Sequence, residues 1–358
     1  MNRLTHDPIL KHVINNIKKL DKYNYLNPNK IETNFDKVIK KHIEYISFVS
    51  TYIKNNTNLV KVGDFHQSKY TIKTIHNEDN LYFKPRGVNN ILYIKEIFKI
   101  LNLKNKYIDS IIQTDKINNF YISKELPNNK HIIDYDIFSY SLGRLLPIIN
   151  ELRMYDLHSD NFIVNQSDIS ISDYDCITYP TSQNLPRYSI LNSLIFESKN
   201  NKIPLIKSDD TKKLNIDLLL NGVDATYQHI EDNKNCLYDL YDFYKKRISN
   251  RIILKPTKFY LECIARSFHP KLIKSTYERR NFIEQCLSGN SNISRAIIKS
   301  EITDLMCLDI PYFTLSGFNL YDSRNKLINS GLFTLEKQKY GNKSILFNEL
   351  SKLLNIPL

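Results

Sequence analysis

The chain has no tryptophan, only five cysteines and no glycine-rich phosphate-binding loop in its 358 residues. The cysteines form no C-x-x-C pair and are odd in number, which argues against a disulfide framework and favours a reducing compartment. No Cys/His group has the spacing of a zinc site. Neither G-x-G-x-x-G nor a Walker sequence occurs, so neither an ordinary protein kinase nor a P-loop enzyme fits. The lack of tryptophan, beside 24 tyrosines, reflects codon bias rather than chemistry.

Long hydrophobic runs are also missing, and acidic residues are outnumbered by basic ones. No window is long enough to span a bilayer, and residues 1–20 have neither an uninterrupted apolar stretch nor a cleavage signal. These features predict a soluble cytoplasmic protein with no membrane span. The formal net charge of +12 permits nucleotide phosphates, an acidic peptide, nucleic acid or a membrane surface as partners. Because the basic residues are scattered, a generally basic solvated surface is the simpler explanation, and no nucleic acid partner is expected.

The order of the expected elements indicates the fold class. Amphipathic helices are expected at about 7–20 and 34–53. Strands follow at 59–62, 70–75 and 81–84, then a helix over 89–103, strands near 110–114 and 120–123, and a mostly helical pattern from 132 onward. The chain is therefore predicted to be α+β, with a two-lobed kinase-like fold and a mostly helical C-terminal part.

The same pattern predicts a division of the chain into four parts that pack as one cooperative body, because no long Gly/Ser/Pro linker separates them. They are an N-terminal helical segment (1–55), a small lobe (56–130), a large lobe (131–235) and a helical C-terminal region (236–358) that contributes to the site. The length is sufficient for two lobes with a sizeable core.

The densest chemical signal lies in residues 155–164, Y-D-L-H-S-D-N-F-I-V, followed by D-Y-D at 173–175. Phosphoryl transfer needs an acid–base group near the attacking hydroxyl and oxygen ligands for magnesium on the nucleotide phosphates. Asp156 and Asn161 have the relation of a catalytic-loop aspartate and a metal-binding asparagine. Asp173, twelve residues beyond Asn161, follows a short apolar strand and stands where a second metal-binding carboxylate belongs. A polar turn between two strands is the simpler alternative, but this spacing is uncommon in such turns.

Upstream, Lys84 ends a predicted strand. A lysine on a small-lobe strand can pair with nucleotide phosphates as a compact point charge. An ordinary surface lysine is the alternative, but the distance to the Asp156 loop favours a functional role. Glu96, on the next helix, would either pair with Lys84 or lie on a solvated face. Together with the Asp156 loop, Lys84 predicts a kinase-like phosphotransferase that uses ATP and Mg²⁺.

Several short blocks occur in one order along residues 59–315. They are Gly63-Asp-Phe-His66, Phe83-Lys-Pro-Arg86, Asp156-Leu-His-Ser-Asp-Asn161, Asp173-Tyr-Asp175, Arg251-Ile-Ile-Leu-Lys-Pro-Thr257 with Tyr260, Ser267-Phe-His-Pro270, Glu301-Ile-Thr-Asp-Leu305 and Asp309-Ile-Pro-Tyr-Phe313. Each block is weak alone. As an ordered set they resemble the dehydratase domain of class II lanthipeptide synthetases.

The resemblance implies a two-step reaction on a precursor peptide. ATP would phosphorylate a Ser or Thr hydroxyl, and elimination of phosphate would then give dehydroalanine or dehydrobutyrine. By motif position, Lys84 would bind the ATP phosphates, while Asp156 and His158 would serve phosphoryl transfer. Asn161 and Asp173 would hold Mg²⁺ on the nucleotide.

By the same resemblance, elimination would fall to Asp64, His66, Arg251 and Thr257, with Lys84 shared between the steps. Losing a β-phosphate requires a base for the α-proton, stabilisation of enolate-like charge and a cation on the departing phosphate. Arginine offers a bidentate phosphate contact, and a histidine can exchange protons near neutral pH. The simpler alternatives are an ordinary loop histidine at 66 and a helix-end salt bridge and cap at Arg251 and Thr257.

The chain also departs from the family pattern. Asp175 ends a D-x-D where D-x-E is usual, and Lys255 replaces an arginine, which can weaken a phosphate or peptide contact. The helical region before the Asp64 block is reduced, and the C-terminal cyclase domain with its zinc-binding Cys/His set is absent. The expected partners are thus a precursor peptide, whose acidic leader would suit a basic surface, and a protein replacing the cyclase or the N-terminal region. A plain kinase and a non-catalytic binding module are the rival hypotheses.

Overall fold

The computed structural model describes residues 40–41, 43–52, 58–66, 69–75, 80–128, 132–165, 168–181, 188–197, 204–269, 272, 275–289, 294–330, 333 and 340–354. The chain divides into two compact units. Unit 1 comprises the described parts of Met1–Ile72, Ile252–Thr314 and Leu320–Ser330. Unit 2 comprises the described parts of Lys73–Arg251, Leu315–Asn319 and Gly331–Leu358.

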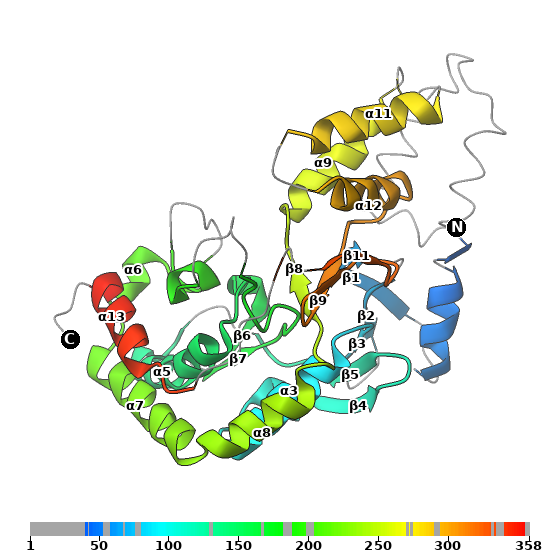
Figure 1. Ribbon diagram of the computed structural model, residues 1–358. Coiled ribbons are helices and arrows are strands. Elements are labelled where there is room, and N and C mark those ends of the chain that lie inside the picture. The colour runs from blue at the N-terminus through cyan, green and yellow to red at the C-terminus, as the bar shows by residue number, and fades with distance from the viewer. Residues whose placement is uncertain are drawn as a thin grey trace. The chain divides into compact units, whose positions relative to one another are not determined.

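The strands form one sheet in the order β1-β2-β3-β5-β4, a second in the order β11-β10-β9-β8, and the pair β6-β7 (Figure 1). Where their register is resolved, in β3–β5, β4–β5 and β6–β7, the pairs are antiparallel. The strand bounds are β1 Asn58–His66, β2 Lys69–Ile75, β3 Leu81–Lys84, β4 Ile111–Asp115, β5 Phe120–Lys124, β6 Phe162–Asn165, β7 Asp168–Ile171, β8 Asn250–Ile252, β9 Phe313–Ser316, β10 Asn319–Tyr321 and β11 Leu327–Ser330.

The helices alternate with these strands in the first half of the described chain and dominate the second half. Their bounds are α3 Val88–Ile100, α4 Lys106–Asp109, α5 Tyr135–Leu152, α6 Ser208–Thr211, α7 Ile216–Asp232, α8 Lys234–Tyr244, α9 Thr257–Ser267, α11 Thr276–Leu287, α12 Arg295–Met306 and α13 Lys343–Leu354, with 3₁₀ turns η2 Ser159–Asn161 and η3 Ile190–Ser193. Residues 40–41 and 43–52 are also helical.

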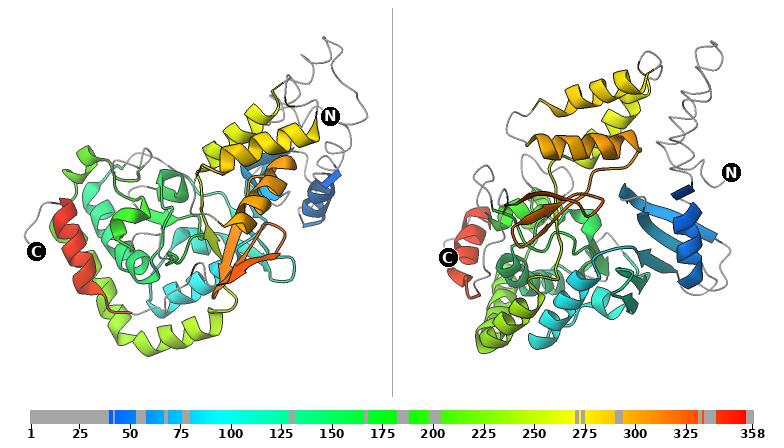
Figure 2. Two further views of the ribbon diagram at one scale, coloured as in Figure 1. Left: turned by 45° about the horizontal axis from the view of Figure 1, so that its top comes forward. Right: turned by 45° about the vertical axis from the view of Figure 1, so that its right-hand side comes forward.

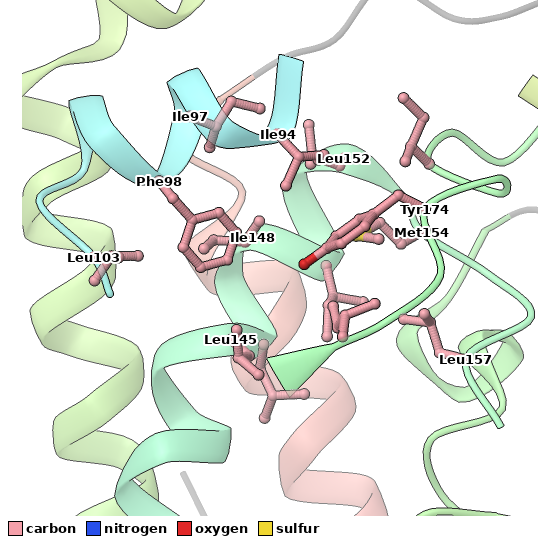
Figure 3. Packing of buried hydrophobic residues seen from close by; sticks show 14 of the residues in the cluster. Ile94, Ile97, Phe98, Leu103, Leu145, Ile148, Leu152, Met154, Leu157 and Tyr174 are labelled. Atoms are coloured by element: carbon pink, nitrogen blue, oxygen red, sulfur yellow. The ribbon is translucent and has the colours of Figure 1, made fainter. Parts of the chain in front are cut away.

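The core of unit 2 forms where the apolar faces of α3 and α5 meet. Ile94, Ile97 and Phe98 of α3 are buried in one cluster with Leu145 and Ile148 of α5 (Figure 3). These positions recur every three or four residues, which places them on one face of each helix. Burying large aliphatic and aromatic side chains in this way stabilises the unit by about 1.5–3 kcal/mol for each side chain.

Helix α5 also crosses α7 at very close range. A Cβ added at Gly143 of α5 would lie 2.1 Å from the carbonyl oxygen of Leu219, and one added at Gly222 of α7 would lie 2.5 Å from the carbonyl oxygen of Tyr140. Only glycine permits two helix backbones to approach this closely. The crossing thereby fixes the middle of α5 against α7, nine residues before α5 ends at Leu152.

Unit 1 contains a smaller core between three helices. In both views of Figure 2, α9, α11 and α12 lie together, and their cluster includes buried Ile264, Phe268, Ile283 and Leu305. The sequence supplies a suitable cap for α11, since the Ser275 side chain accepts hydrogen bonds from the first turn.

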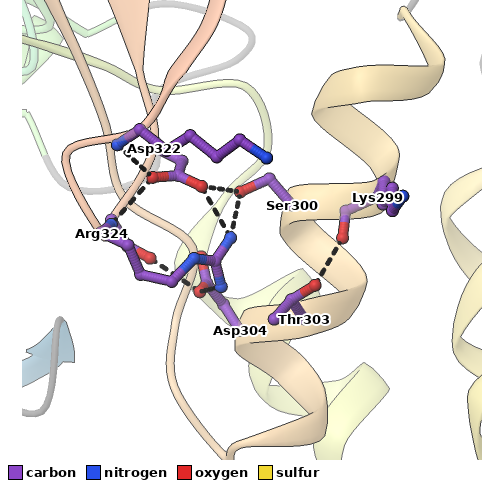
Figure 4. A network of polar contacts seen from close by, with 8 residues as sticks. Lys299, Ser300, Thr303, Asp304, Asp322 and Arg324 are labelled. Carbon is purple, nitrogen blue, oxygen red and sulfur yellow. Dashed lines mark hydrogen bonds and ion pairs between the residues drawn. The ribbon is translucent and has the colours of Figure 1, made fainter.

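A polar network ties α12 to the turn between β10 and β11 (Figure 4). The Arg324 guanidinium donates to Asp304 of α12 at 3.0 Å and to Asp322 at 2.7 Å. Ser300 donates to Asp322 at 3.1 Å, and Ser323 donates to Asp304 at 2.7 Å. One arginine therefore serves two buried carboxylates in this network.

The structure confirms the α+β class, and β1 to β5 with α3 confirm the elements predicted between residues 59 and 123. The predicted helix over 7–20 lies outside the described residues, whereas the one over 34–53 is confirmed for residues 43–52. From residue 132 onward the chain is mostly helical but also contains β6 to β11. The two-lobed kinase-like arrangement and the four-part division stay predictions. Among the described residues, no helix combines the length and the apolar character that crossing a bilayer requires.

Candidate functional site

Unit 2 contains a small pocket whose walls come from three separate segments of the chain. It is lined by Tyr155, Asp156, Asn161, Asp173, Asp175, Cys176 and Arg251. These residues belong to the loop and 3₁₀ turn after α5, the segment after β7, and strand β8. The pocket thus brings together Asp156, Asn161 and Asp173, which their sequence spacing singled out, and it adds Arg251, which was assigned to elimination.

The loop that carries Asp156 is held on both sides of that residue. The backbone N–H of Tyr155 donates to the carbonyl of Cys176 at 3.1 Å, and that of Leu157 donates to the carbonyl of Ser193 at 2.7 Å. Between these anchors Asp156 has a φ of 59°. This left-handed conformation is uncommon for a residue with a side chain and occurs frequently at functional sites.

Asn161 closes the turn behind Asp156. Its Nδ2 donates to the Asp156 carbonyl at 2.7 Å and lies 3.4 Å from His158 Nε2. His158 is itself fixed, because its Nδ1 accepts the backbone N–H of Asp160 at 3.3 Å. The turn therefore uses the amide nitrogen of Asn161 internally, and the side-chain oxygen is the atom that can coordinate a cation.

Asp173 follows the β6–β7 hairpin, which brings it back to the same turn. The backbone N–H of Ser172 donates to the carbonyl of Asn161 at 2.9 Å. Asp173 Oδ1 accepts the backbone N–H of Asp175 at 2.9 Å, which fixes the D-x-D segment in a tight turn. The hairpin accounts for the twelve-residue separation between Asn161 and Asp173 noted in the sequence.

Lys84 lies at the end of β3 and reaches the same segment. Its Nζ donates to the Ser172 carbonyl at 2.7 Å and lies 5.1 Å from the centre of the Tyr107 ring. Burial lowers the pKa of Lys84, but Tyr107 and the carboxylates of Asp173 and Asp175 outweigh burial and raise it, so the amine stays charged. Glu96 pairs instead with Lys99, at 3.9 Å on the surface of α3, as the solvated-face alternative predicts.

The pKa values of two carboxyl groups in the pocket, those of Asp156 and Asp175, are raised above their usual range. Burial raises the pKa of Asp156, and Asp173 and Asp175 raise it further, against the opposing charges of Arg251 and His158. Burial and Asp173 likewise raise the pKa of Asp175, against Arg86, Arg251 and Lys84. A carboxylate with a raised pKa is a stronger base, which suits proton transfer from a hydroxyl.

The donor set of this pocket suits magnesium held jointly with phosphate. Within the described ranges, no three His, Cys, Asp or Glu side chains are grouped so that they could hold a metal by themselves. Asn161 and Asp173 offer one amide oxygen and one carboxylate on the wall of one pocket. Mg²⁺ bound with a nucleotide usually takes one or two protein oxygens and leaves its other positions to phosphate and water.

The other residues assigned to elimination belong to unit 1. Asp64 and His66 are in strand β1, and Thr257 is the first residue of α9, directly after Pro256 as N-cap. Thr257 is therefore not the cap that the simpler alternative expected. The phosphoryl-transfer residues and Arg251 thus belong to unit 2, whereas Asp64, His66 and Thr257 belong to unit 1.

Lys255 also belongs to unit 1, where it makes a buried ion pair. Its Nζ donates to the two carboxylate oxygens of Glu301 at 2.7 and 2.9 Å, and the Tyr260 hydroxyl donates to Glu301 at 2.6 Å. The sequence suggested a weakened phosphate or peptide contact at Lys255. In the structure this charge is matched by Glu301, and the pair joins the segment before α9 to α12.

Sequence reasoning missed the contributions of Tyr155 and Cys176 to the pocket and treated Asp175 only as a departure from a motif. The Tyr155 hydroxyl donates to the carbonyl of Arg251, which anchors β8 beside the Asp156 loop. Tyr155 and Arg251 are 96 residues apart in the sequence, so no local pattern indicates the hydrogen bond between them.

Comparisons with known proteins agree with the motif pattern at a coarse level. Residues 191–316 match a family described as a domain of unknown function, DUF4135. The chain is also similar to the lacticin 481/lactococcin biosynthesis protein LcnDR2 of Lactococcus lactis subsp. lactis, with 21% identity over 357 residues. That alignment covers 77% of this chain and 37% of the relative, so the chain spans well under half of the relative's length. The two similarities point to a family related to lanthipeptide synthetases.

Proposed function

We propose that this chain takes part in lanthipeptide modification as an ATP- and Mg²⁺-dependent dehydratase of Ser and Thr residues in a precursor peptide. The observation that carries the proposal is the pocket of unit 2, where Asp156, Asn161, Asp173 and Arg251 lie around one small volume. The similarity to a lacticin 481/lactococcin biosynthesis protein supports a peptide as substrate.

In the first step, a Ser or Thr hydroxyl oxygen attacks the γ-phosphorus of ATP. The new O–P bond forms as the bond to ADP breaks, and Asp156 accepts the hydroxyl proton. The raised pKa of Asp156 favours this transfer. His158, on the same turn, lies 3.4 Å from Asn161 and helps to keep the turn in shape.

A bound Mg²⁺ would supply positive charge to neutralise the phosphate during transfer. Asn161 and Asp173 are the residues that would hold it. The charged amine of Lys84, half-buried beside Ser172, would exchange its carbonyl contact for a phosphate oxygen. Such fixed charges act most strongly where water is excluded from a site.

In the second step, a base removes the α-proton of the phosphorylated residue, the Cβ–O bond breaks, and inorganic phosphate leaves. Arg251 supplies a cation for the departing phosphate, and a guanidinium can bind two phosphate oxygens at once. His66, Asp64 and Thr257 are proposed to serve the proton transfers and the enolate-like charge, with Lys84 shared between the steps. The products are dehydroalanine from Ser and dehydrobutyrine from Thr.

A plain kinase is the alternative. One observation favours it: the phosphoryl-transfer residues all belong to unit 2, while Asp64, His66 and Thr257 belong to unit 1. Phosphoryl transfer could therefore proceed in unit 2 without the second step. An acidic leader on the substrate and a partner protein that acts after dehydration are further parts of the proposal.

Mass spectrometry distinguishes the two functions. A candidate precursor peptide with an acidic leader and a core rich in Ser, Thr and Cys is incubated with the protein, ATP and Mg²⁺. The dehydratase predicts the loss of one water per modified residue in wild type, and accumulation of one phosphate per site in Arg251→Ala and His66→Ala. Asp156→Asn should leave the peptide mass unchanged. If wild type yields only phosphopeptide even after long incubation, the plain kinase is correct.

ATP and metal binding are tested separately by titration with a non-hydrolysable ATP analogue in the presence and absence of Mg²⁺. Asp173→Ala should weaken the magnesium-dependent part of the affinity, because a carboxylate ligand is lost. An unchanged magnesium dependence would show that Asp173 is not a ligand.

A further inference from the structure

Asn90 on α3 is a buried polar residue to which the sequence gave no role. Its side chain is 1% exposed. Its Nδ2 donates to the carbonyls of Tyr174 and Ser249, both at 2.9 Å, and its Oδ1 accepts the backbone N–H of Ser249 at 3.0 Å. An amide side chain offers two donor hydrogens and an acceptor oxygen, so both of its ends are engaged.

These partners belong to the segments that carry the candidate site. Tyr174 is the middle residue of the D-x-D turn, and Ser249 precedes Arg251 by two residues. Asn90 itself follows Lys84 by six residues, at the start of the helix after β3. One side chain therefore connects the segment proposed to bind metal, the strand that carries Arg251, and the helix that follows Lys84.

Neighbouring bonds join two of these three segments again. Asn250, which is fully buried, accepts the backbone N–H of Thr178 at 2.9 Å and donates to the carbonyl of the same residue. The backbone N–H of Arg251 donates to the Asp175 carbonyl at 2.8 Å. Among these contacts, those of Asn90 are the ones that also reach α3.

We propose that Asn90 is a positioning residue of the site, which holds the D-x-D turn and the Arg251 strand in register so that Arg251 lies against Asp156 and Asp175. The Tyr174 carbonyl is buried, and a buried backbone group that loses its partner is costly, so the D-x-D turn would shift relative to the Arg251 strand if Asn90 were removed. A small displacement of a catalytic group is enough to slow a reaction strongly. The catalytic consequence rests on the proposed function, whereas the positioning is a property of the fold.

The positioning is tested by hydrogen exchange at single-residue resolution in full-length Asn90→Ala. The Ser249 amide loses its acceptor directly, so the decision rests on the amides of Asp175 and Arg251. Their own acceptors, Asp173 Oδ1 and the Asp175 carbonyl, are untouched by the substitution. We expect these two amides to exchange about ten- to a hundredfold faster than in wild type.

The matched control is Asn150→Ala. Asn150 is also a buried asparagine on a helix of unit 2, where its Nδ2 donates to the Tyr227 hydroxyl at 3.2 Å. This control should leave the Asp175 and Arg251 amides unchanged. Unchanged exchange at those amides in Asn90→Ala, or an equal acceleration along α5 and α7, would overturn the proposal.

The catalytic consequence is tested by a double-mutant cycle on phosphate elimination from the phosphorylated precursor peptide. If Asn90 acts through Arg251, Asn90→Ala slows elimination by about tenfold or more in wild type and slows it little further in Arg251→Ala. Equal slowing in both backgrounds would overturn positioning through Arg251. If wild type eliminates no phosphate, the dehydratase proposal fails, and the exchange of the Asp175 and Arg251 amides alone decides the positioning role.

Discussion

The buried Lys255–Glu301 pair of unit 1 and the carboxylates of the unit 2 pocket are arranged differently. In unit 1, Glu301 is fully buried and receives two bonds from Lys255 and one from Tyr260. In unit 2, Asp156 and Asp175 share a pocket with a third carboxylate, Asp173, and the pKa values of Asp156 and Asp175 are raised by burial and by the charge of Asp173. In the unit 1 pair, the positive charge of Lys255 neutralises the negative charge of Glu301. The unit 2 pocket keeps like charges close together.

This difference separates a structural role from a chemical one. A paired carboxylate fixes two segments of chain to each other and has no capacity left for another cation. Crowded carboxylates with raised pKa values are suited to accept a proton or to bind an added cation, and such groups concentrate at functional sites. The comparison predicts loss of activity from changes in the unit 2 pocket and loss of stability from changes at the unit 1 pair.

The largest expected effect is on phosphorylation in Asp156→Asn. Removal of a general base typically slows a reaction by about a hundred- to ten-thousandfold, and the nearly isosteric amide should leave the fold intact. The rate of phosphate transfer from ATP to the precursor peptide is the measurement. Asp160→Asn, an exposed aspartate of the same turn, is the control and should retain nearly full activity. Equal losses in both variants would show that Asp156, which lines the pocket, matters no more for phosphorylation than the exposed Asp160.

The next effect is on stability, in Glu301→Gln. Breaking a buried ion pair leaves Lys255 charged and unmatched, which destabilises a protein by about 3–5 kcal/mol. Urea denaturation measures the change. Glu262→Gln is the control, because Glu262 pairs with Lys258 at 3.9 Å on the surface, and such pairs contribute at most about 1 kcal/mol.

A paired replacement sharpens this test. Lys255→Met together with Glu301→Leu should be far less destabilising than Glu301→Gln, because no unmatched charge remains. If the double variant is as unstable as Glu301→Gln, the contribution of Glu301 to stability does not come from its charge.

A smaller effect concerns the pH dependence of stability in unit 1. Asp304 shares Arg324 with Asp322, and burial raises its pKa to about 6, against the bond from Ser323 and the charge of Arg324. A carboxyl with a raised pKa binds its proton more tightly in the folded state, so its contribution is present below about pH 4 and is lost as pH rises through about 6.

The difference in unfolding free energy between wild type and Asp304→Asn isolates this contribution. It should change by up to about 3 kcal/mol between pH 4 and pH 6 and then stay constant. Denaturation curves at several pH values provide the measurement. A constant difference throughout that range would show that Asp304 titrates normally in the folded protein.

The smallest predicted effect is a shift of the pH–rate profile in Asp175→Asn. Because Asp175 raises the pKa of Asp156, removing its charge should lower that pKa. The acid limb of phosphorylation should then move to lower pH, whatever happens to the maximal rate. Asp160→Asn again serves as the control, and a limb that stays in place would show that the two carboxylates are not coupled.

Local patterns predicted much of unit 2. A short strand-like run indicated β3, and a helix was expected over residues that include most of α3. The spacing of Asp156, Asn161 and Asp173 predicted that they would lie together, because a turn and a hairpin can bring such residues to one side. These inferences depend on short stretches of chain, where sequence separation and spatial separation remain closely linked.

Long-range contacts were not predictable in this way. Asn90 joins Tyr174 and Ser249 through bonds between segments that no periodicity connects. The pairing of Lys255 with Glu301 likewise depends on how α9 and α12 pack. A single sequence does not distinguish a buried asparagine from a surface one. Likewise, Lys255 resembles a phosphate ligand in the sequence, and only the structure shows that it is paired with Glu301.

The backbone of Asp156 has a consequence for the engineering of this protein. Its φ of 59° is a conformation that glycine adopts freely and that other residues adopt at a cost of about 1 kcal/mol or more. Repeated selection for heat resistance alone should therefore favour glycine or asparagine at position 156. If Asp156 is the proposed base, a library recovered in that way would be rich in stable but inactive proteins, and a stabilisation campaign would have to select for turnover in every round.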